Sequence, residues 1–207
     1  MQNLIIDIGN TAVKAAWAEG PTIGKTFRYQ GERVRNFILS LTEKEKPSVM
    51  IISSVNEISA HDEAAYSNEC ERLIIMDSAH TQVLADNGVP EWVSCDRAAS
   101  VIAVRHLFRG NGCTVMDFGT TFSIDFIDKD GGYAGGNISL GCRTRFKALN
   151  RYSRALPLVD TPSEIVFPGD SFLSSVTSGI ISGIMFEIEG YLSSNSSDSI
   201  VFTGGDA

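Results

Sequence analysis

The sequence predicts an α/β protein of two lobes with a cleft between them. A short pattern of Asp, Gly and Thr occurs twice, as Asp7-Ile8-Gly9-Asn10-Thr11 and as Asp117-Phe118-Gly119-Thr120-Thr121. Each copy lies between two runs of residues that are typical of strands, and alternating helical and strand-like segments follow. A chain of 207 residues is long enough to bury a real core. Because ligands commonly bind between lobes, we expect the functional site in the cleft.

The first copy opens an N-terminal lobe that we place at residues 1–93. A helix at 32–41 is indicated by Phe37, Ile38 and Leu41, whose spacing puts them on one helical face. Residues 77–93 are expected to form a loop, because Asn87-Gly88 and Pro90 interrupt a regular pattern. The other elements expected in this lobe are strands at 3–8, 12–18, 24–30, 49–53 and 73–76, and a helix at 62–72.

The second lobe is placed at residues 94–207 and repeats the strand-rich pattern. It is expected to begin with a helix from Asp96 to Phe108, which ends before Gly110. The turn Asp130-Gly131-Gly132 is typical of a hairpin between two strands. The remaining elements expected here are strands at 113–117, 121–128, 132–138 and 200–203, and helices at 143–152 and 172–192.

Composition narrows the class of protein. The formal charge of −8 and the pI near 4.9 disfavour a nucleic-acid-binding surface, which needs clustered Lys and Arg. The N-terminus lacks the basic region of a signal peptide, and the uncharged stretch from Ser171 to Phe186 is shorter than the ~20 residues that span a bilayer. The four cysteines are too widely spaced for a zinc site. We therefore expect a cytoplasmic protein that binds neither nucleic acid nor membrane.

The repeated pattern suits phosphate chemistry. Gly9 and Gly119 permit a positive φ, which would bring backbone N–H groups close to an anion. Asn10 and the Thr hydroxyls add donors, and an acidic residue at a strand end can hold hydrated Mg²⁺ through oxygen. Lys14 could reach a phosphate from the second strand, or could be a surface residue. The alternative for either copy alone is a tight hairpin, since these are ordinary turn residues.

Six segments of the chain form one pattern by their order and spacing. They are Asp7-Ile8-Gly9-Asn10-Thr11, Asp96-Arg97, Asp117-Phe118-Gly119-Thr120, Gly135-Gly136-Asn137-Ile138, Leu156-Pro157 and Thr203-Gly204-Gly205. Together these segments resemble the type III pantothenate kinases of the acetate and sugar kinase/Hsp70/actin superfamily. The resemblance implies two ribonuclease-H-like lobes with an interlobe cleft, the actin-like ATPase fold. It implies ATP-dependent phosphorylation of pantothenate, the first step of coenzyme A synthesis, by a homodimer that uses Mg²⁺ and K⁺ or NH₄⁺. The family continues beyond the point where this sequence ends.

The resemblance also implies roles for single residues. Asp96 would be the general base that accepts the proton of the pantothenate hydroxyl, and Arg97 would pair with the substrate carboxylate. Asp7 would hold Mg²⁺, and Asp117 the monovalent cation. The residues implied for nucleotide binding are Asp7, Gly9, Asn10, Thr11, Lys14, Gly119, Thr120, Gly204 and Gly205. Those implied for the acceptor are Ser94, Arg97, Ser153 and Phe172.

Structural alternatives stay open for several of these residues. Asp7 could cap a turn, and Asp96 could only stabilise the first turn of its helix through the macrodipole. Arg97 could be a solvated helix-surface arginine. Gly179 and Gly183, four residues apart, could pack at a dimer interface or form the small-residue face of a core helix.

The departures from the family pattern fall mainly on the acceptor side. A family glycine is Ser94, a tyrosine is Asn87 and a threonine is Phe172. Further differences are Leu140 for proline, Tyr152 for a histidine-like position and Ser153 for threonine. Three hypotheses follow: a pantothenate kinase, a kinase of the same fold with another small hydroxy acid as acceptor, or a non-catalytic nucleotide-binding regulatory protein.

Overall fold

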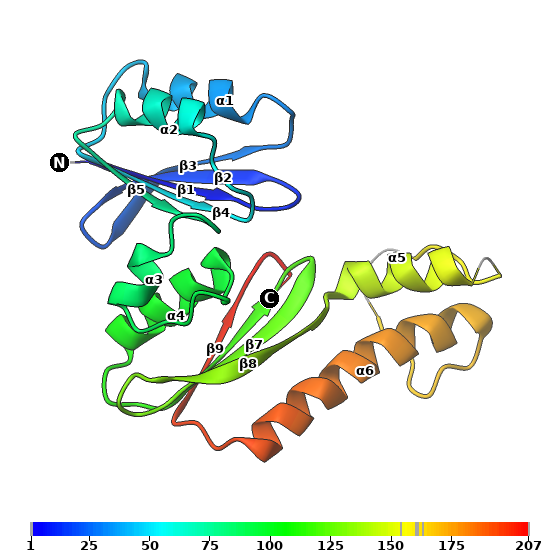
Figure 1. Cartoon of the computed structure of the whole chain (residues 1–207). Helices are drawn as coiled ribbons and strands as arrows, with labels where there is room; N and C mark the ends of the chain where they lie inside the picture. Colours follow the sequence, from blue (N-terminus) through cyan, green and yellow to red (C-terminus); the bar gives the residue numbers. More distant parts are fainter. Residues whose placement is uncertain (1, 154, 160–161, 163, 207) are drawn as a thin grey trace. The chain divides into compact units, whose positions relative to one another are not determined.

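The computed structural model describes residues 2–153, 155–159, 162 and 164–206 (Figure 1). The chain forms two compact units, Met1–Ile102 and Ala103–Ala207. The division falls inside helix α4 (Cys95–Leu107). The assignment of residues 1–93 and 94–207 to two functional lobes stays a prediction.

The first unit is a five-stranded sheet with two helices above one face (Figure 1). Strand β1 pairs antiparallel with β2 and parallel with β4, so the strand order is β3-β2-β1-β4-β5. The strands are β1 (Asn3–Ile8), β2 (Val13–Glu19), β3 (Thr22–Tyr29), β4 (Val49–Ser54) and β5 (Arg72–Met76), and the two helices are α1 (Val34–Thr42) and α2 (Ala60–Ser67).

The alternation of side chains along β1 separates the two faces of this sheet. Leu4 and Ile6 are fully buried in the core that Ile38 of α1 and Tyr66 of α2 complete. Residues at odd positions of a strand whose even positions face the core must point the other way. Asp7 therefore lies on the face opposite to the two helices.

Two elements of the first unit differ from the sequence prediction. Helix α2 ends at Ser67 instead of residue 72, because the chain turns there to enter β5 at Arg72. The predicted loop 77–93 contains a helix, α3 (Gln82–Asp86). It holds a single apolar anchor, the buried Leu84, which is too little for a periodic signal. Asn87-Gly88 ends this helix, with Gly88 at φ 60°.

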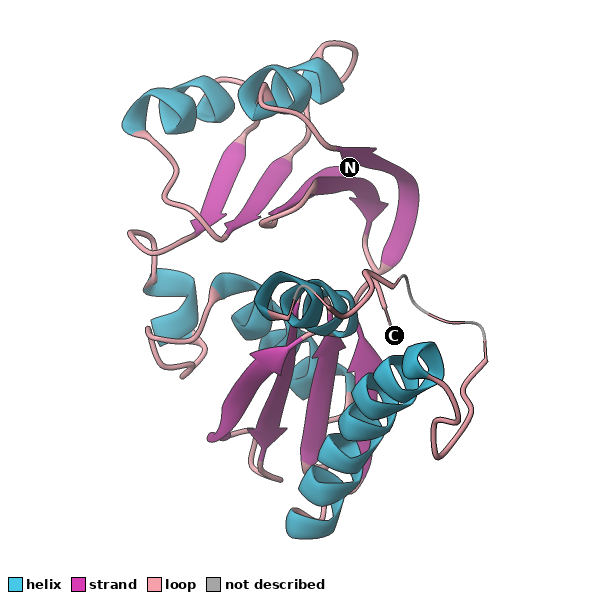
Figure 2. Ribbon diagram, turned by 90° about the vertical axis from the view of Figure 1, so that its right-hand side faces the viewer, coloured by secondary structure: helices cyan, strands magenta, loops and turns pink. Residues whose placement is uncertain are grey.

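The second unit repeats the topology of the first. Strand β6 pairs antiparallel with β7 and parallel with β9, which gives the order β8-β7-β6-β9. Its core contains Met116, Phe122 and Ile124, and helix α6 packs Ile188 and Leu192 against it (Figure 2). The elements are β6 (Cys113–Phe118), β7 (Thr121–Ile127), β8 (Tyr133–Leu140), β9 (Ser199–Thr203), α5 (Cys142–Tyr152) and α6 (Phe172–Ser194). The duplication predicted from the repeated pattern is confirmed as a fold.

Helix α6 is unusually apolar. By length and composition alone it could cross a membrane, with a mean hydropathy of 1.2 over its most apolar window and 17% of that window buried. Large side chains such as Phe172, Leu173, Met185 and Phe186 are exposed on it. A long apolar helix in a protein interior or interface meets the same criterion, so this property by itself does not define a membrane segment.

Candidate active site

The first Asp-x-Gly-x-Thr turn joins β1 to β2. Asp7 is opposite Lys14 in the antiparallel register, so the two side chains lie on the same face of the sheet. The turn is closed by the Gly9 N–H, which donates to the Ala12 carbonyl at 3.1 Å. Asn10 and Thr11 at its tip are exposed. The carboxylate and the ammonium therefore share the face opposite to α1 and α2, and the turn lies at the end of their strands.

The environment of Asp7 combines burial with two opposing charges. Burial raises the pKa of the Asp7 carboxyl, the Lys14 ammonium lowers it, and the negative charge of Asp96 raises it again, with a net upward shift. The influence of Asp96 on Asp7 shows that the first turn of α4 comes close to the end of β1. Asp7 and Asp96, for which the resemblance implies separate roles, therefore influence each other electrostatically.

The residues around Asp96 differ in exposure. Ser94 and Asp96 are exposed, and one Asp96 oxygen accepts the backbone N–H of Arg97 at 2.8 Å. Arg97 is only 5% exposed, so the alternative of a solvated surface arginine is wrong. A buried guanidinium with a fixed fork can orient a carboxylate more exactly than a mobile one can. Its contact with the substrate stays a prediction.

Asp77 was missed by the sequence analysis. It is fully buried directly after β5, and burial raises its pKa, but four hydrogen bonds lower it to a net value below normal. These come from the N–H of Ile58 at 2.8 Å, from the N–H groups of Ala79 and His80 at 2.9 Å each, and from the His80 ring at 2.8 Å. Asp77 and Asp96 both raise the pKa of Cys95, whose main perturbation is burial. Asp77 thus ties the Ile58 segment to the turn that follows β5, and its position after a buried strand was the available signal.

The second Asp-x-Gly-x-Thr turn joins β6 to β7 and is crowded by the end of β9. A Cβ built on Gly204 would lie 2.3 Å from the Phe118 carbonyl oxygen and 2.5 Å from Asp117 Oδ1. Gly204 has φ 104°, and the N–H of Asp206 donates to the same carbonyl at 2.9 Å. The end of β9 therefore lies against the second turn, with Gly204 beside the Asp117 carboxylate. A shared role of these two residues in nucleotide binding stays a prediction. At Gly205 an added Cβ would meet no atom within 4 Å.

The prediction of positive φ at the two turn glycines is wrong. Gly9 and Gly119 are absent from the glycines with positive φ in the described residues. Both turns close with ordinary backbone angles, because the glycine N–H reaches a carbonyl two or three residues on; in the second turn, Gly119 donates to Thr121 at 3.0 Å. The absence of a side chain at these positions leaves the backbone accessible.

Gly141 is a second residue that the sequence analysis missed. A Cβ on Gly141 would lie 1.9 Å from the Gly119 carbonyl oxygen, and its N–H donates to Thr120 at 3.1 Å. Thr144, in the first turn of α5, also donates its hydroxyl to the Thr120 carbonyl, at 2.7 Å. The start of α5 is therefore built against the second turn. A glycine directly before a predicted helix was the available signal.

The acceptor candidates lie apart in the sequence and in different elements. Ser153 ends α5, and Phe172 begins α6 with 60% of its surface exposed. Both belong to the second unit, whereas Ser94 and Arg97 belong to the first. Their meeting in one acceptor pocket, and the opening of both turns on one cleft, stay predictions.

The described residues contain no group of three or more His, Cys, Asp or Glu side chains arranged to hold a metal ion. Asp7 nevertheless fits hydrated Mg²⁺: its carboxylate is partly desolvated and is repelled by Asp96, so a divalent cation would relieve both effects. Mg²⁺ commonly binds through one or two carboxylates together with substrate phosphates, which agrees with this sparse donor set.

Comparisons with known proteins cover nearly the whole chain. The family model for type III pantothenate kinase matches residues 3–194. The type III pantothenate kinase of Phocaeicola vulgatus is 38% identical over 213 residues, which cover 99% of this chain and 86% of the relative.

Solved structures support the fold alone. A Campylobacter jejuni protein described as a Baf family transcriptional activator gives a TM-score of 0.62 at 21% identity, over 99% of this chain and 84% of that one. The ROK hexokinase of Thermus thermophilus gives a TM-score of 0.57 at 12% identity, over 100% of this chain and 83% of that one. Both likenesses support the fold of two α/β units.

Proposed function

The chain belongs to the type III pantothenate kinase family, and we propose how its residues divide the work of the family's reaction. The enzyme transfers a phosphoryl group from ATP to the hydroxyl of pantothenate, the first step of coenzyme A biosynthesis. Such transfers depend on positioning and on neutralising charge. The observation that carries the assignment of residues is the electrostatic influence of Asp96, in the first turn of α4, on Asp7 at the end of β1.

Asp7, Lys14 and the first turn form the phosphate side of this site. Asp7 would hold Mg²⁺, which when bound neutralises phosphate charge. Lys14, opposite Asp7 in the register, would supply a positive charge to the terminal phosphates. Gly9, Asn10 and Thr11 would direct backbone and side-chain donors toward the same oxygens, because the turn is exposed and carries no bulky group.

Asp96 would orient the pantothenate hydroxyl and accept its proton as the oxygen attacks the phosphoryl group. Its backbone is fixed in the first turn of α4, and one carboxylate oxygen is held by the Arg97 N–H. The exposed carboxylate can then present its other oxygen to the acceptor. Arg97 would neutralise the substrate carboxylate next to it, with Ser94 adding a hydroxyl.

The second turn would bind the nucleotide from the other unit. Gly119 and Thr120 would contact phosphate, and Gly204 and Gly205 would let the β9 end approach the nucleotide closely. Asp117 would hold K⁺ or NH₄⁺. The Asp117 carboxylate and the Phe118 carbonyl both lie against Gly204, so oxygen atoms are gathered there, which fits a cation.

Helix α6 would form the interface of a cytoplasmic homodimer. Phe172, Met185 and Phe186 are at least half exposed, and Phe167 stacks edge-on against Phe186 with ring centroids 6.4 Å apart. A Cβ at Gly179 would meet nothing within 4 Å, so a second helix could approach closely there. Apolar surface of this kind is normally covered by a partner. Light scattering of the purified protein and of Phe186→Glu tests this, and a monomer in both cases would contradict it.

A different acceptor is the second candidate, and Phe172 favours it. Its ring adds apolar surface at the start of α6, where the family pattern has a hydroxyl. ADP release, measured with pantothenate and with a panel of small hydroxy acids, separates the candidates. The assay contains Mg²⁺ and either K⁺, NH₄⁺ or Na⁺. We expect pantothenate to be preferred and K⁺ or NH₄⁺ to activate. Preference for another hydroxy acid would reassign the acceptor, and equal rates with Na⁺ would remove the cation site.

A further inference from the structure

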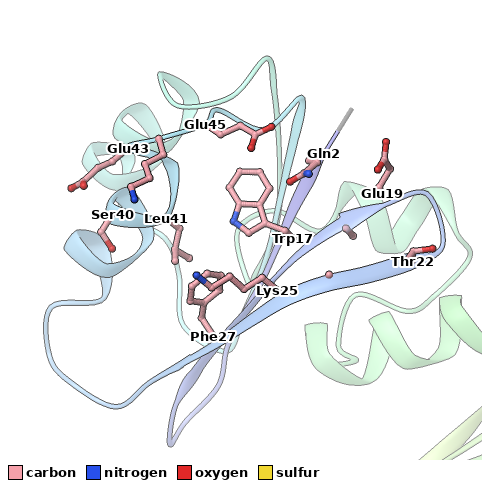
Figure 3. A pocket seen from close by; sticks show the side chains of 13 residues that line it. Gln2, Trp17, Glu19, Thr22, Lys25, Phe27, Ser40, Leu41, Glu43 and Glu45 are labelled. Atoms are coloured by element: carbon pink, nitrogen blue, oxygen red, sulfur yellow. The ribbon is translucent and has the colours of Figure 1, made fainter.

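A pocket of about 550 Å³ lies on the helix-covered side of the first sheet, between β2, β3 and the end of α1 (Figure 3). Trp17 is opposite Leu4 in the β1–β2 register, and Leu4 belongs to the core under the helices. Lys14 is opposite Asp7 on the other face. The pocket is therefore separated from the proposed catalytic face by the thickness of the sheet, and its volume is that of a small-molecule site.

The floor of this pocket is aromatic. Trp17 and Phe27 are half-buried, and both pack against the core of the first unit. The ammonium of Lys25 lies 4.9 Å from the centroid of the Phe27 ring. Attraction between a cation and a ring face is strongest for tryptophan. The Lys25 ammonium therefore already lies over one of the two rings, Phe27, which attracts a cation less strongly than Trp17 does.

The rim of the pocket is more acidic than basic. Its charged residues are Glu19, Lys25, Glu43, Lys44 and Glu45, which give a formal sum of −1. The C-terminal end of α1, at Thr42, adds the negative end of a helix dipole. In Figure 3 the Trp17 ring lies between Lys25 on one side and Glu45 on the other. An anion would meet three carboxylates and two ammonium groups here, whereas a cation would meet the same groups and, in addition, the faces of two aromatic rings.

We propose that this pocket binds a small organic cation, an ammonium or guanidinium group on a compact apolar body. The charged group lies over the Trp17 face, and Glu45 supplies the counter-charge. Lys25 competes for the same aromatic floor. The site does not depend on the kinase reaction, since it lies on the opposite face of the sheet.

Tryptophan fluorescence can test this proposal directly. The chain has two tryptophans, so a Trp92→Phe background reports on Trp17 alone. The probes are benzyltrimethylammonium, benzyl alcohol and benzoate, which share a ring and differ in charge. We expect saturable binding of the cation and at least tenfold weaker binding of the other two, because the ring face and the rim both favour positive charge.

Three variants sharpen the result. Glu45→Lys should weaken binding of the cation about tenfold, and Lys25→Ala should tighten it several-fold by freeing the Phe27 ring. Glu71→Lys, an exposed reversal outside the pocket, should change the affinity less than twofold. Stronger binding of benzoate, weaker binding of the cation to Lys25→Ala, or equal effects of both charge reversals would overturn the proposal. Unchanged chemical shifts of β2 and β3 amides on titration would overturn it as well.

Discussion

The two Asp-x-Gly-x-Thr turns have the same topology but different surroundings. In the first unit the pKa of Asp7 is set by burial and by two charges. Burial raises it, Lys14 across the strand pair lowers it, and Asp96 of α4 raises it. In the second unit the turn is constrained by backbone, since Gly204 and Gly141 both lie within atomic contact of it. The same local sequence therefore has a charged environment in one unit and is packed closely against backbone in the other. The residues around a repeated motif, more than the motif itself, determine its function.

The largest effect is expected from Asp96→Asn. The amide keeps the size of the side chain but cannot accept the hydroxyl proton, so kcat should fall about 10²–10⁴-fold. Affinity for a non-hydrolysable ATP analogue should change little. Asp130→Asn, in the exposed β7–β8 hairpin, is the matched control and should keep full turnover. Turnover near the parent value in Asp96→Asn would remove this residue from the mechanism.

Asp7→Asn tests the electrostatic character of the first turn. Loss of the carboxylate should lower kcat about 10²-fold, because phosphate positioning through Mg²⁺ would fail. The free protein should become more stable at pH 7, because the ionised carboxylate is disfavoured by burial and by Asp96.

The pH dependence of that stability follows from the raised pKa of Asp7. In the parent protein, the ionised Asp7 carboxylate lowers the free energy of unfolding. This destabilisation is fully present above the folded-state pKa of Asp7, and it is lost as the pH falls through that pKa toward the unfolded-state value. The melting-temperature advantage of Asp7→Asn should shrink accordingly in acid. A variant less stable than the parent at pH 7 would contradict this account.

Gly204→Ala tests the steric character of the second turn. The new Cβ would collide with the Phe118 carbonyl oxygen at 2.3 Å, at a φ of 104°. We expect a loss of about 1–3 kcal/mol in the free energy of unfolding, measured by urea denaturation, and weaker nucleotide binding.

Two alanine variants serve as controls for that measurement. At Gly205 a Cβ meets nothing within 4 Å, and at Gly9 it would touch the Ala12 carbonyl oxygen at 3.4 Å, an ordinary contact. Both variants should lose clearly less free energy of unfolding than Gly204→Ala does. Equal costs for all three would mean that the two turns do not differ as described.

The smallest effect is expected at the start of α6. If Phe172 replaces a hydroxyl that bonds the acceptor, Phe172→Thr should tighten pantothenate binding by about 0.5–1.5 kcal/mol, or up to roughly tenfold. Calorimetric titration in the presence of an ATP analogue measures it. Absence of pantothenate binding to both proteins would exclude pantothenate as the acceptor.

The parts of the fold that local patterns encode were predictable. Runs of strand-like residues predicted β1 and β2, and the duplicated turn predicted two units of one topology. Helix α3 was not predictable, since Leu84 is its single buried residue. Asp77 and Gly141 escaped because their partners, Ile58 and Gly119, are distant in sequence and are backbone groups without a residue signature.

The buried Asp77 carboxylate has a consequence for local unfolding. Its hydrogen bonds tie the Ile58 segment to the turn that follows β5, and they favour the ionised form. Ionised Asp77 therefore contributes to the free energy of unfolding. This contribution is fully present above the unfolded-state pKa of Asp77, and it is lost as the pH falls through the lowered folded-state pKa. The amides of Ile58, Ala79 and His80 should therefore lose their protection from hydrogen exchange together in acid. The sheet amides of β1 and β4 would keep theirs, so the turn around Asp77 would open as one cooperative unit.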